Sequence, residues 1–326
     1  MKVLVSWMNR LGTYVSREFY YIMQDLIRVH EWRQIEPSVL PRNPAAVRAA
    51  LLDVLGEIPE VMLFWEAYDL CISMGPALLD IGCRKCVFVD DLHWRDDADK
   101  EVKSLGLSLC DTILCTYAYA IDEYYPELRN RKKIVWVPHS ASPDFVMPFN
   151  DQPQNALLLS GCVNEHYPLR QRVKKLRDEE RYPIRLHEHP GYGAEFDYER
   201  DPRIGAGYAR LIHRYKAAFT DSLWMKYVVA KYFEIPATGA LLFADSAVSQ
   251  QLKELGLLEN LHYIPASREN LEDQIRYILN PSHDSELDEI RRRGQEVVLS
   301  RHKTSDRAKL IDQVCAVKTN VVRHGN

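Results

Sequence analysis

The chain has 326 residues, which is enough for two domains of ordinary size. Hydrophobic residues make up 46% of it and charged residues 27%, proportions typical of a soluble globular protein. The formal net charge of −4 argues against a general nucleic-acid-binding surface, and no apolar run approaches the roughly 18–20 residues of a membrane span.

Strand-like and helical patterns alternate through the first half. Residues 3–7 are predicted to form a buried strand, because this apolar run is too short for a signal peptide. We therefore expect a cytoplasmic protein. A helix follows around residues 19–27, with apolar side chains on one face, and another is expected over 44–56. The other strands predicted in this half are 61–65, 85–89, 112–115 and 133–137.

The alternation resumes after a segment with little periodicity. Residues 143–153 contain three prolines and are predicted to be a linker. The strands predicted beyond it are 156–161, 184–187, 216–220, 240–244 and 263–264. Strands separated by helices indicate parallel βαβ units, whose ligands lie at the carboxyl ends of the strands. We expect an α/β protein with domains 1–150 and 151–326, and a last helix able to cross back to the first domain.

The seven cysteines have an odd count and irregular spacing. Cys83 and Cys86 form a lone CxxC motif, without the second pair of ligands that a structural zinc site usually needs. Cys110, Cys115 and Cys162 lie in apolar runs and are predicted to be small core residues in a reducing compartment. We expect no metal and no cofactor.

The segment 231–245 carries the most information. It reads as a helix end, a turn with Pro, Thr and Gly, and a buried strand. The N–H groups of Thr238 and Gly239 are expected to be exposed in this turn, where they can bind an anion. Glu234 is placed to accept hydrogen bonds from hydroxyls. A diphosphate joined to a ribose fits such a pair, although an ordinary helix–loop–strand unit with an incidental Glu has the same pattern.

This segment resembles the donor-binding motif of glycosyltransferases with the GT-B fold, especially the family-four-like group that contains the spore-maturation glycosyltransferases. The segments that continue the likeness in order are Leu252–Gly256, His262–Pro265, Glu269–Leu271, Arg293–Gln295 and Arg301–Thr304. The likeness covers residues 155–310 well and 1–150 weakly. It implies two Rossmann-like domains facing a central cleft. The second domain would bind a UDP- or GDP-sugar and the first a carbohydrate or other hydroxyl acceptor. Transfer would retain the anomeric configuration without a metal.

Further candidates follow the first strand of the second half. Gly161 ends that strand before a helix, a place where a phosphate can approach closely. Asn164 and Arg170 come next, and Arg170 could bind a phosphate oxygen bidentately. Tyr-Pro-x-Arg after a strand and Gly also resembles the spore-maturation group. The alternative is that Arg170 is a solvated helix residue.

Three more residues of the second half are candidates. Lys226 or Lys231 is expected to neutralise the leaving diphosphate, and we take Lys231, with Arg170, as catalytic. His187 follows the second strand, in a loop that resembles the part of the fold packing on a nucleotide base. A polar loop with surface histidines is the alternative reading of His187.

The first half contributes weaker signals. His93 resembles the histidine that faces the donor sugar in family-four-like enzymes, so it is a catalytic candidate, or else a structural histidine. Asp91 lies beside it, but no Asp-x-Asp metal motif directly follows a predicted strand. His139 lies in a segment that resembles the interdomain hinge. Gly12 follows the first strand and resembles a loop that approaches the donor phosphates or the acceptor.

The sequence therefore predicts a glycosyltransferase. Two other functions stay open. A sugar-nucleotide epimerase would convert the donor without an acceptor, and a catalytically silent binding protein would hold it without releasing a nucleotide.

Overall fold

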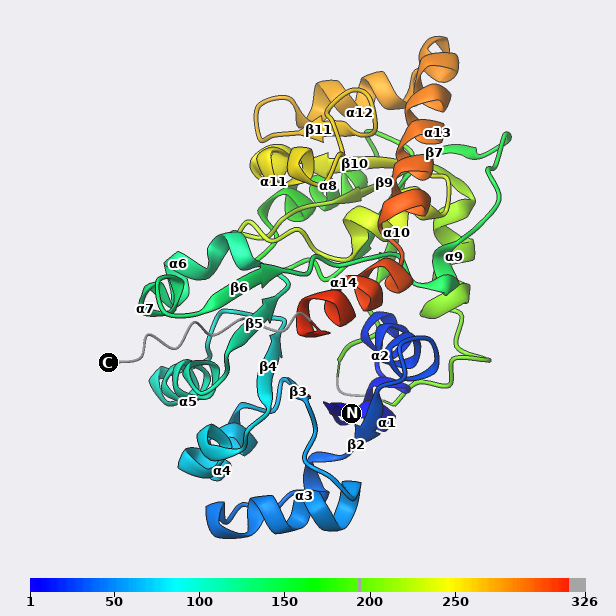
Figure 1. Cartoon of the computed structure of the whole chain (residues 1–326). Helices are drawn as coiled ribbons and strands as arrows, with labels where there is room; N and C mark the ends of the chain where they lie inside the picture. The colour runs from blue at the N-terminus through cyan, green and yellow to red at the C-terminus, as the bar shows by residue number, and fades with distance from the viewer. Residues whose placement is uncertain (193–194, 317–326) are drawn as a thin grey trace. The chain divides into compact units, whose positions relative to one another are not determined.

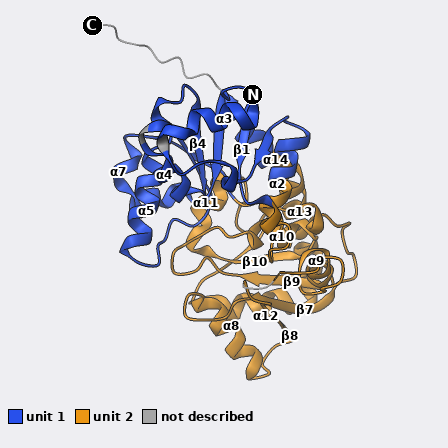
Figure 2. Ribbon diagram, turned by 90° about the horizontal axis from the view of Figure 1, so that it is seen from below, with its two compact units in different colours: residues 1–8, 22–138, 307–326 blue, residues 9–21, 139–306 orange. Residues whose placement is uncertain are grey.

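The computed structural model describes residues 1–192 and 195–316. The chain divides into two compact units, which Figure 2 colours separately. Unit 1 comprises residues 1–8, 22–138 and the described residues from 307 onward, and unit 2 comprises 9–21 and 139–306. The residues just after the first strand thus belong to unit 2, with the second half of the chain. The assignment of 1–150 and 151–326 to two domains stays a prediction.

Unit 1 contains a six-stranded parallel sheet in the order β2-β1-β3-β4-β5-β6. Its strands are β1 (Lys2–Val5), β2 (Arg33–Ile35), β3 (Val61–Trp65), β4 (Arg84–Val89), β5 (Thr112–Cys115) and β6 (Lys133–Trp136). All five residues of β3 are buried, as expected of an inner strand covered on both faces. The sequence does not predict β2, which has three residues and one apolar side chain.

Helices flank the strands of this sheet in Figure 1. They are α3 (Val47–Leu55), α4 (Tyr68–Asp80), α5 (Asp97–Ser108), α6 (Ile121–Tyr124) and α7 (Pro126–Arg129). Three further helices contain residues of both units: α1 (Met8–Leu11), α2 (Glu18–Arg28) and α14 (Thr304–Ala316). Helix α5 begins where the Asp96 side chain accepts a hydrogen bond from the N–H of Asp99 at 2.8 Å, a typical N-cap.

Unit 2 contains a five-stranded parallel sheet in the order β11-β10-β9-β7-β8. Its strands are β7 (Gln154–Gly161), β8 (Ile184–Glu188), β9 (Tyr215–Thr220), β10 (Leu241–Asp245) and β11 (Ile264–Ala266). The chain runs from β7 to β8 on one side and then returns to β9 on the other side of β7. The carboxyl ends of β7 and β9 therefore form the switch point, where ligands of open α/β sheets usually bind.

Six helices of unit 2 connect or cover these strands (Figure 1). They are α8 (Pro168–Asp178), α9 (Gly205–His213), α10 (Lys231–Ala237), α11 (Ser249–Glu254), α12 (Leu271–Leu279) and α13 (Asp284–Arg301). Two side chains of α13 hold the segment predicted as a linker. Arg291 donates to the carbonyl of Asn150 at 2.8 Å, and Gln295 donates to that of Met147 at 2.9 Å. Residues 143–153 are thus anchored within unit 2.

The core of unit 2 is aliphatic and aromatic. Leu157, Phe219 and Phe243 project from adjacent strands and are fully buried, together with Val173 of α8 and Ile275 of α12. Six of the seven cysteines are buried, and all seven are free thiols. Cys110 and Cys115 are among the buried ones, which confirms the prediction that they are core residues, whereas Cys162 is partly exposed. No helix among the described residues is long and apolar enough to cross a membrane.

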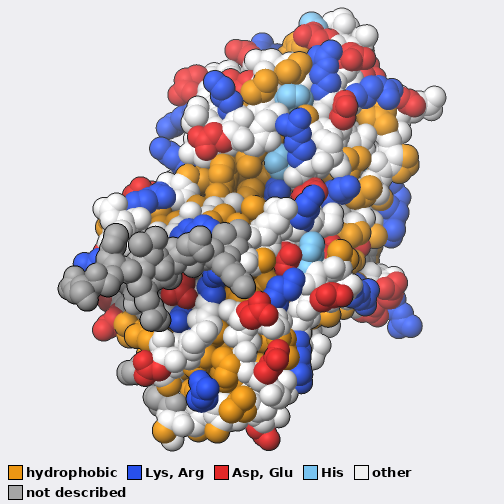
Figure 3. Space-filling model, in the orientation of Figure 1, with side chains coloured by type: hydrophobic (Ala, Val, Ile, Leu, Met, Phe, Trp, Pro, Cys, Tyr) orange, Lys and Arg blue, Asp and Glu red, His pale blue; other side chains and the backbone are white. Residues whose placement is uncertain are grey.

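Charged side chains are mixed on the face of the molecule that Figure 3 shows. Lys and Arg side chains alternate with Asp and Glu, and hydrophobic side chains lie between them. Neither the positive nor the negative side chains form one large patch on this face, which agrees with the small net charge of −4.

Candidate functional site

Arg170 and Lys231 converge on Gly161, at the carboxyl end of β7. Gly161 has a φ of +94°, and a Cβ atom there would lie 2.7 Å from Nη1 of Arg170 and 3.0 Å from Cε of Lys231. Only glycine permits this close approach without displacing either cation. Two positive charges from different helices, α8 and α10, are thus gathered at the switch point of the sheet.

Arg170 is 2% exposed, which excludes the reading of this residue as a solvated helix position. Its guanidinium donates to the carbonyl of Cys162 at 3.1 Å and to the hydroxyl of Thr220 at 3.0 Å. It also lies over the Tyr167 ring, 4.0 Å from the centroid. Arg170 therefore joins the ends of β7 and β9, and since a guanidinium has five N–H donors, these two bonds leave others available.

Asp221 anchors this arrangement, although no motif in the sequence marks it. Its Oδ2 accepts hydrogen bonds from the N–H groups of Leu169 and Arg170, both at 3.1 Å, so it caps the start of α8. Its Oδ1 lies 3.4 Å from Nε of Arg170. Burial raises the pKa of Asp221 to about 6, although the charge of Arg170 opposes the shift.

Lys231 is the first residue of α10 and lies beside aromatic rings. Its Nζ is 4.9 Å from the ring centroid of Tyr208. The hydroxyl groups of Tyr208 and Ser160 form a hydrogen bond of 2.6 Å. Burial lowers the pKa of Lys231, but Tyr208 and Glu234 more than offset this, so the net shift is upward. Lys231 is therefore a cation at neutral pH.

Glu234 follows Lys231 by one turn of α10 and is 7% exposed. Burial raises the pKa of its carboxyl, while the charge of Lys231 lowers it. A carboxylate that is buried near the Lys231 cation can accept hydrogen bonds from the hydroxyls of a ligand. The roles predicted for Glu234 and Lys231 in binding the donor stay predictions. Lys226 is exposed in the turn before α10.

The turn after α10 differs from the expectation. Pro236 lies inside the helix, which continues to Ala237. The N–H of Thr238 therefore bonds to the carbonyls of Glu234 and Ile235 at 3.3 and 3.2 Å, and that of Gly239 to the carbonyl of Pro236 at 2.9 Å. Because these N–H groups close the last turn of the helix, they are not exposed to an anion. The role of Thr238 and Gly239 seen here is structural.

His187 and His189 lie at the end of β8, beside the same cluster. The His187 ring stacks on Tyr208 with centroids 5.3 Å apart, and its Nε2 lies 3.3 Å from the carbonyl of Arg203. Burial lowers the pKa of His187, and it lowers that of His189 to about 4, helped by the charges of Lys231 and Arg170. Both rings are therefore neutral at pH 7. Within residues 1–192 and 195–316, no group of three or more His, Cys, Asp or Glu side chains is placed to hold a metal ion.

The segment after β1 is held in unit 2 by the loop before α9. The guanidinium of Arg17 lies 3.6 Å from the ring centroid of Tyr198 and donates to the carbonyl of Gly12 at 2.7 Å. The N–H of Phe196 donates to the carbonyl of Thr13 at 2.9 Å. Gly12 thus contributes a carbonyl that fixes Arg17.

Asn164 also has a local structural role, since its side chain accepts a hydrogen bond from the N–H of His166 at 3.1 Å.

His139 is buried and makes a close pair with a residue that the sequence analysis missed. Its Nδ1 lies 2.7 Å from Oε2 of Glu18, the first residue of α2. No local pattern marks Glu18, because its partner is 121 residues away in the chain.

His93 and Asp91 lie after β4 in unit 1. Nδ1 of His93 is 3.7 Å from Oδ1 of Asp91, and Nζ of Lys103 donates to the carbonyls of both residues at 2.8 and 3.1 Å. The two side chains are 39% and 52% exposed. A role for these residues beside the cations of unit 2 stays a prediction.

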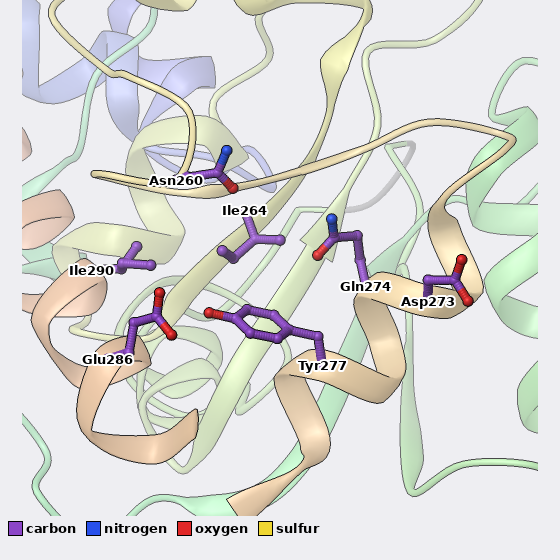
Figure 4. A pocket seen from close by; sticks show the side chains of 7 residues that line it. All are labelled: Asn260, Ile264, Asp273, Gln274, Tyr277, Glu286 and Ile290. Atoms are coloured by element: carbon purple, nitrogen blue, oxygen red, sulfur yellow. The ribbon is translucent and has the colours of Figure 1, made fainter. Parts of the chain in front are cut away.

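A separate pocket of about 360 Å³ lies between β11, α12 and α13 (Figure 4). It is lined by Asn260, Ile264, Asp273, Gln274, Tyr277, Glu286 and Ile290. The hydroxyl of Tyr277 and the carboxylate of Glu286 point toward each other in this view. Ile264 is the first residue of β11, whereas Gly161 and Thr220 end their strands, so this pocket is not part of the cationic cluster.

Residues 169–313 match the model of a family described as glycosyl transferase-like, and no curated protein sequence matches the chain. A sucrose-phosphate synthase from Thermosynechococcus elongatus is similar in structure, with a TM-score of 0.64, 11% identity, and 96% of this chain and 97% of that chain covered.

Two other solved structures are similar. A glycosyltransferase from Rickettsia africae ESF-5 has a TM-score of 0.60 and 11% identity, over 96% of this chain and 97% of that chain. HepE from Anabaena, in complex with UDP-glucose, has a TM-score of 0.56 and 8% identity, over 96% of this chain and 99% of that chain. The chain has the GT-B glycosyltransferase fold, as predicted, and the residues matched by the glycosyl transferase-like model lie mostly in unit 2. Membership of the spore-maturation group stays a prediction.

Proposed function

We propose that the protein transfers a sugar from a nucleoside diphosphate sugar to an acceptor hydroxyl. The observation that carries this proposal is the convergence of Arg170 and Lys231 on Gly161, beside the buried Glu234. The site lies at the switch point of unit 2, and Arg170, Lys231 and Glu234 fall within residues 169–313, which match the glycosyl transferase-like family model.

The two cations would stabilise the leaving group. In the transfer, the bond between the anomeric carbon and the diphosphate breaks, and its electron pair passes to a phosphate oxygen. The acceptor oxygen forms a new bond to that carbon and loses its proton. Negative charge grows on the diphosphate, where Arg170 and the protonated Lys231 can stabilise it more in the transition state than in the bound donor.

Further features of the reaction follow from the family resemblance. We propose that the anomeric configuration is retained, with the acceptor proton passing to the leaving phosphate on the same face of the sugar. The two cations would neutralise the diphosphate without a metal ion. Glu234 would accept hydrogen bonds from the ribose of a UDP- or GDP-sugar. His93 of unit 1 remains a catalytic candidate at the donor sugar, and Asp91 remains a candidate for binding the substrate. The free cysteines favour a reducing, cytoplasmic location.

Binding and turnover of UDP-glucose test the proposal. UDP-glucose and GDP-mannose should raise the melting temperature, since a ligand of the native state stabilises it. A panel of sugar and polyol acceptors should then make nucleotide release depend on the acceptor. Epimerised donor without an acceptor would identify an epimerase instead, and binding without any conversion would identify a binding protein.

A pair of lysine variants locates the site. Lys231→Met should weaken UDP binding about 10- to 100-fold, equivalent to a lost charged hydrogen bond of about 1.5–3 kcal/mol. Lys174→Met is the matched control, because Lys174 lies on α8 with a 42% exposed side chain paired to Asp178. Equal affinities of the two variants would contradict a diphosphate site at Lys231.

A further inference from the structure

The turn that follows β9 is strained and closely held. Leu223 and Lys226 have φ angles of +60° and +55°, in the left-handed region that is unfavourable for residues other than glycine. The N–H of Tyr227 donates to the carbonyl of Ser222 at 2.7 Å, and the hydroxyl of Ser222 donates to Oδ2 of Asp245 at 2.6 Å. These bonds hold a conformation that the residues would not adopt by themselves. Because such strain collects at binding and catalytic sites, the turn is a candidate for function.

Trp224 is the aromatic side chain that this turn presents to solvent, and it is 59% exposed. Its backbone N–H donates to the carbonyl of His166 at 3.1 Å, and its indole Nε1–H donates to Nδ1 of the same histidine at 3.1 Å. Two bonds to one residue fix the orientation of the indole and satisfy its polar edge. A rigid aromatic side chain loses little conformational entropy when another ring binds to it. Trp224 is therefore prepared to bind a ring.

Both partners of this contact adjoin residues that touch Arg170. His166 directly precedes Tyr167, whose ring centroid lies 4.0 Å from the guanidinium of Arg170. Asp221, which accepts a hydrogen bond from the N–H of Arg170 at 3.1 Å, comes three residues before Trp224. Since successive Cα atoms are about 3.8 Å apart, the Cα atoms of Asp221 and Trp224 are at most about 11 Å apart. The indole thus lies at the carboxyl ends of β7 and β9, close to Arg170.

We propose that Trp224 is a stacking platform for the sugar ring of the donor. This inference rests on the proposed function and assigns the substrate class as nucleotides that carry a hexopyranose. A pyranose has a face of C–H groups that can lie on the electron-rich face of an indole, and the contact removes apolar surface of both from water. The sugar is joined directly to the diphosphate, which stays within reach of Arg170. Because the acceptor must reach the transferred sugar, an exposed platform suits this ring better than it suits the nucleotide base.

Trp224→Leu and Trp224→Phe separate the aromatic face from the hydrogen bond. Leucine removes both the face and the indole N–H, whereas phenylalanine removes the N–H and keeps an aromatic face. Both variants should fold, because Trp224 is 59% exposed and its backbone bond to His166 persists. Tyr182→Leu is the matched control. Tyr182 also belongs to unit 2, but it precedes β8 at the opposite edge of the sheet, where its hydroxyl donates to Glu272 at 2.9 Å.

The experiment is calorimetric titration of each variant with UDP-glucose and with UDP, which lacks the sugar. Trp224→Leu should lower the affinity for UDP-glucose about 3- to 10-fold, the loss expected for one aromatic ring contact, and should leave the affinity for UDP unchanged. Trp224→Phe should retain most of the wild-type affinity for UDP-glucose, and Tyr182→Leu should retain all of it. If the wild type binds only GDP-mannose, GDP-mannose and GDP replace the uridine pair with the same expectations.

The outcomes separate this inference from the proposed function. If Trp224→Leu binds UDP-glucose as tightly as the wild type, the platform is overturned while the function stands. An equal loss of affinity for UDP also overturns it, because the indole would then contact the nucleotide or only support the fold. An equal loss in Trp224→Phe overturns it as well, because the aromatic face would not be what holds the sugar. If the wild type binds neither UDP-glucose nor GDP-mannose, the inference and the function both fail.

Circular dichroism and thermal unfolding check that each variant folds. If Trp224→Leu does not fold, Trp224→Gln takes its place with the same expected loss, because glutamine also lacks an aromatic face.

Discussion

Replacing Gly161 with alanine places a methyl group where two cations meet. A side chain at a φ of +94° costs about 1–2 kcal/mol in backbone strain. The new Cβ would lie 2.7 Å from Nη1 of Arg170, so the guanidinium must move away from Cys162 and Thr220. Loss of a charged hydrogen bond adds about 1.5–3 kcal/mol. We therefore expect the free energy of unfolding to fall by about 2.5–5 kcal/mol, the sum of these two ranges.

Gly191→Ala is the control for the strain. Gly191 has a φ of +98°, but a Cβ there would meet no atom within 4 Å. Gly191→Ala should therefore lower the free energy of unfolding only by the backbone strain of about 1–2 kcal/mol. Urea unfolding measures the difference between the two variants, and titration with UDP-glucose should show at least a tenfold weaker affinity for Gly161→Ala. If both variants unfold at the same urea concentration and bind equally well, the reasoning about this strand end is refuted.

Four other results are expected. Glu234→Ala should weaken UDP-glucose binding by about 1–3 kcal/mol, and unchanged affinity in titrations would remove Glu234 from the site. His93→Ala should lower kcat by about 10²–10⁴-fold in a nucleotide-release assay, with nucleotide affinity retained; equal loss of both would indicate a folding role. Exhaustive EDTA treatment should leave turnover unchanged. If EDTA abolishes turnover and added Mn²⁺ or Mg²⁺ restores it, the transfer depends on a metal and this prediction is wrong. Because the pKa of His189 falls to about 4 on folding, the unfolded chain binds more protons between about pH 4 and 6.5. Stability should therefore decline as the pH falls through this window, and melting temperatures at pH 5 and 7 should differ less in His189→Gln than in the wild type.

The sequence predicts those parts of the site that depend on neighbours in the chain. Gly161 ends an apolar run and precedes a helix, which is a local pattern, and Lys231 and Glu234 lie one helical turn apart. The turn after α10 shows the limit of this reasoning. Pro236 favours a turn by its type, yet the structure keeps it in the helix, so the N–H groups of Thr238 and Gly239 bond to carbonyls.

Residues whose partners are distant in sequence could not be predicted. Asp221 caps α8 through residues 51 and 52 positions earlier, and Glu18 binds partners 121 and 122 positions later. Periodicity carries no information about such pairs. Strand β2 was missed for a different reason, since a three-residue edge strand with one apolar side chain has too short a pattern to recognise.

The membership of residues 9–21 in unit 2 has a consequence for biosynthesis. Glu18 leaves the ribosome 121 residues before His139, which corresponds to about 6–24 s at 5–20 residues per second. During that interval the carboxylate is solvated and α2 lacks the packing of Phe19 on His139. A fragment beginning at residue 139 would never gain these partners, and the N–H of Ser140 would have no acceptor at Glu18. Unit 2 can therefore be completed only after most of unit 1 has been synthesised, so an attempt to express it alone should include the first 21 residues, joined through a linker.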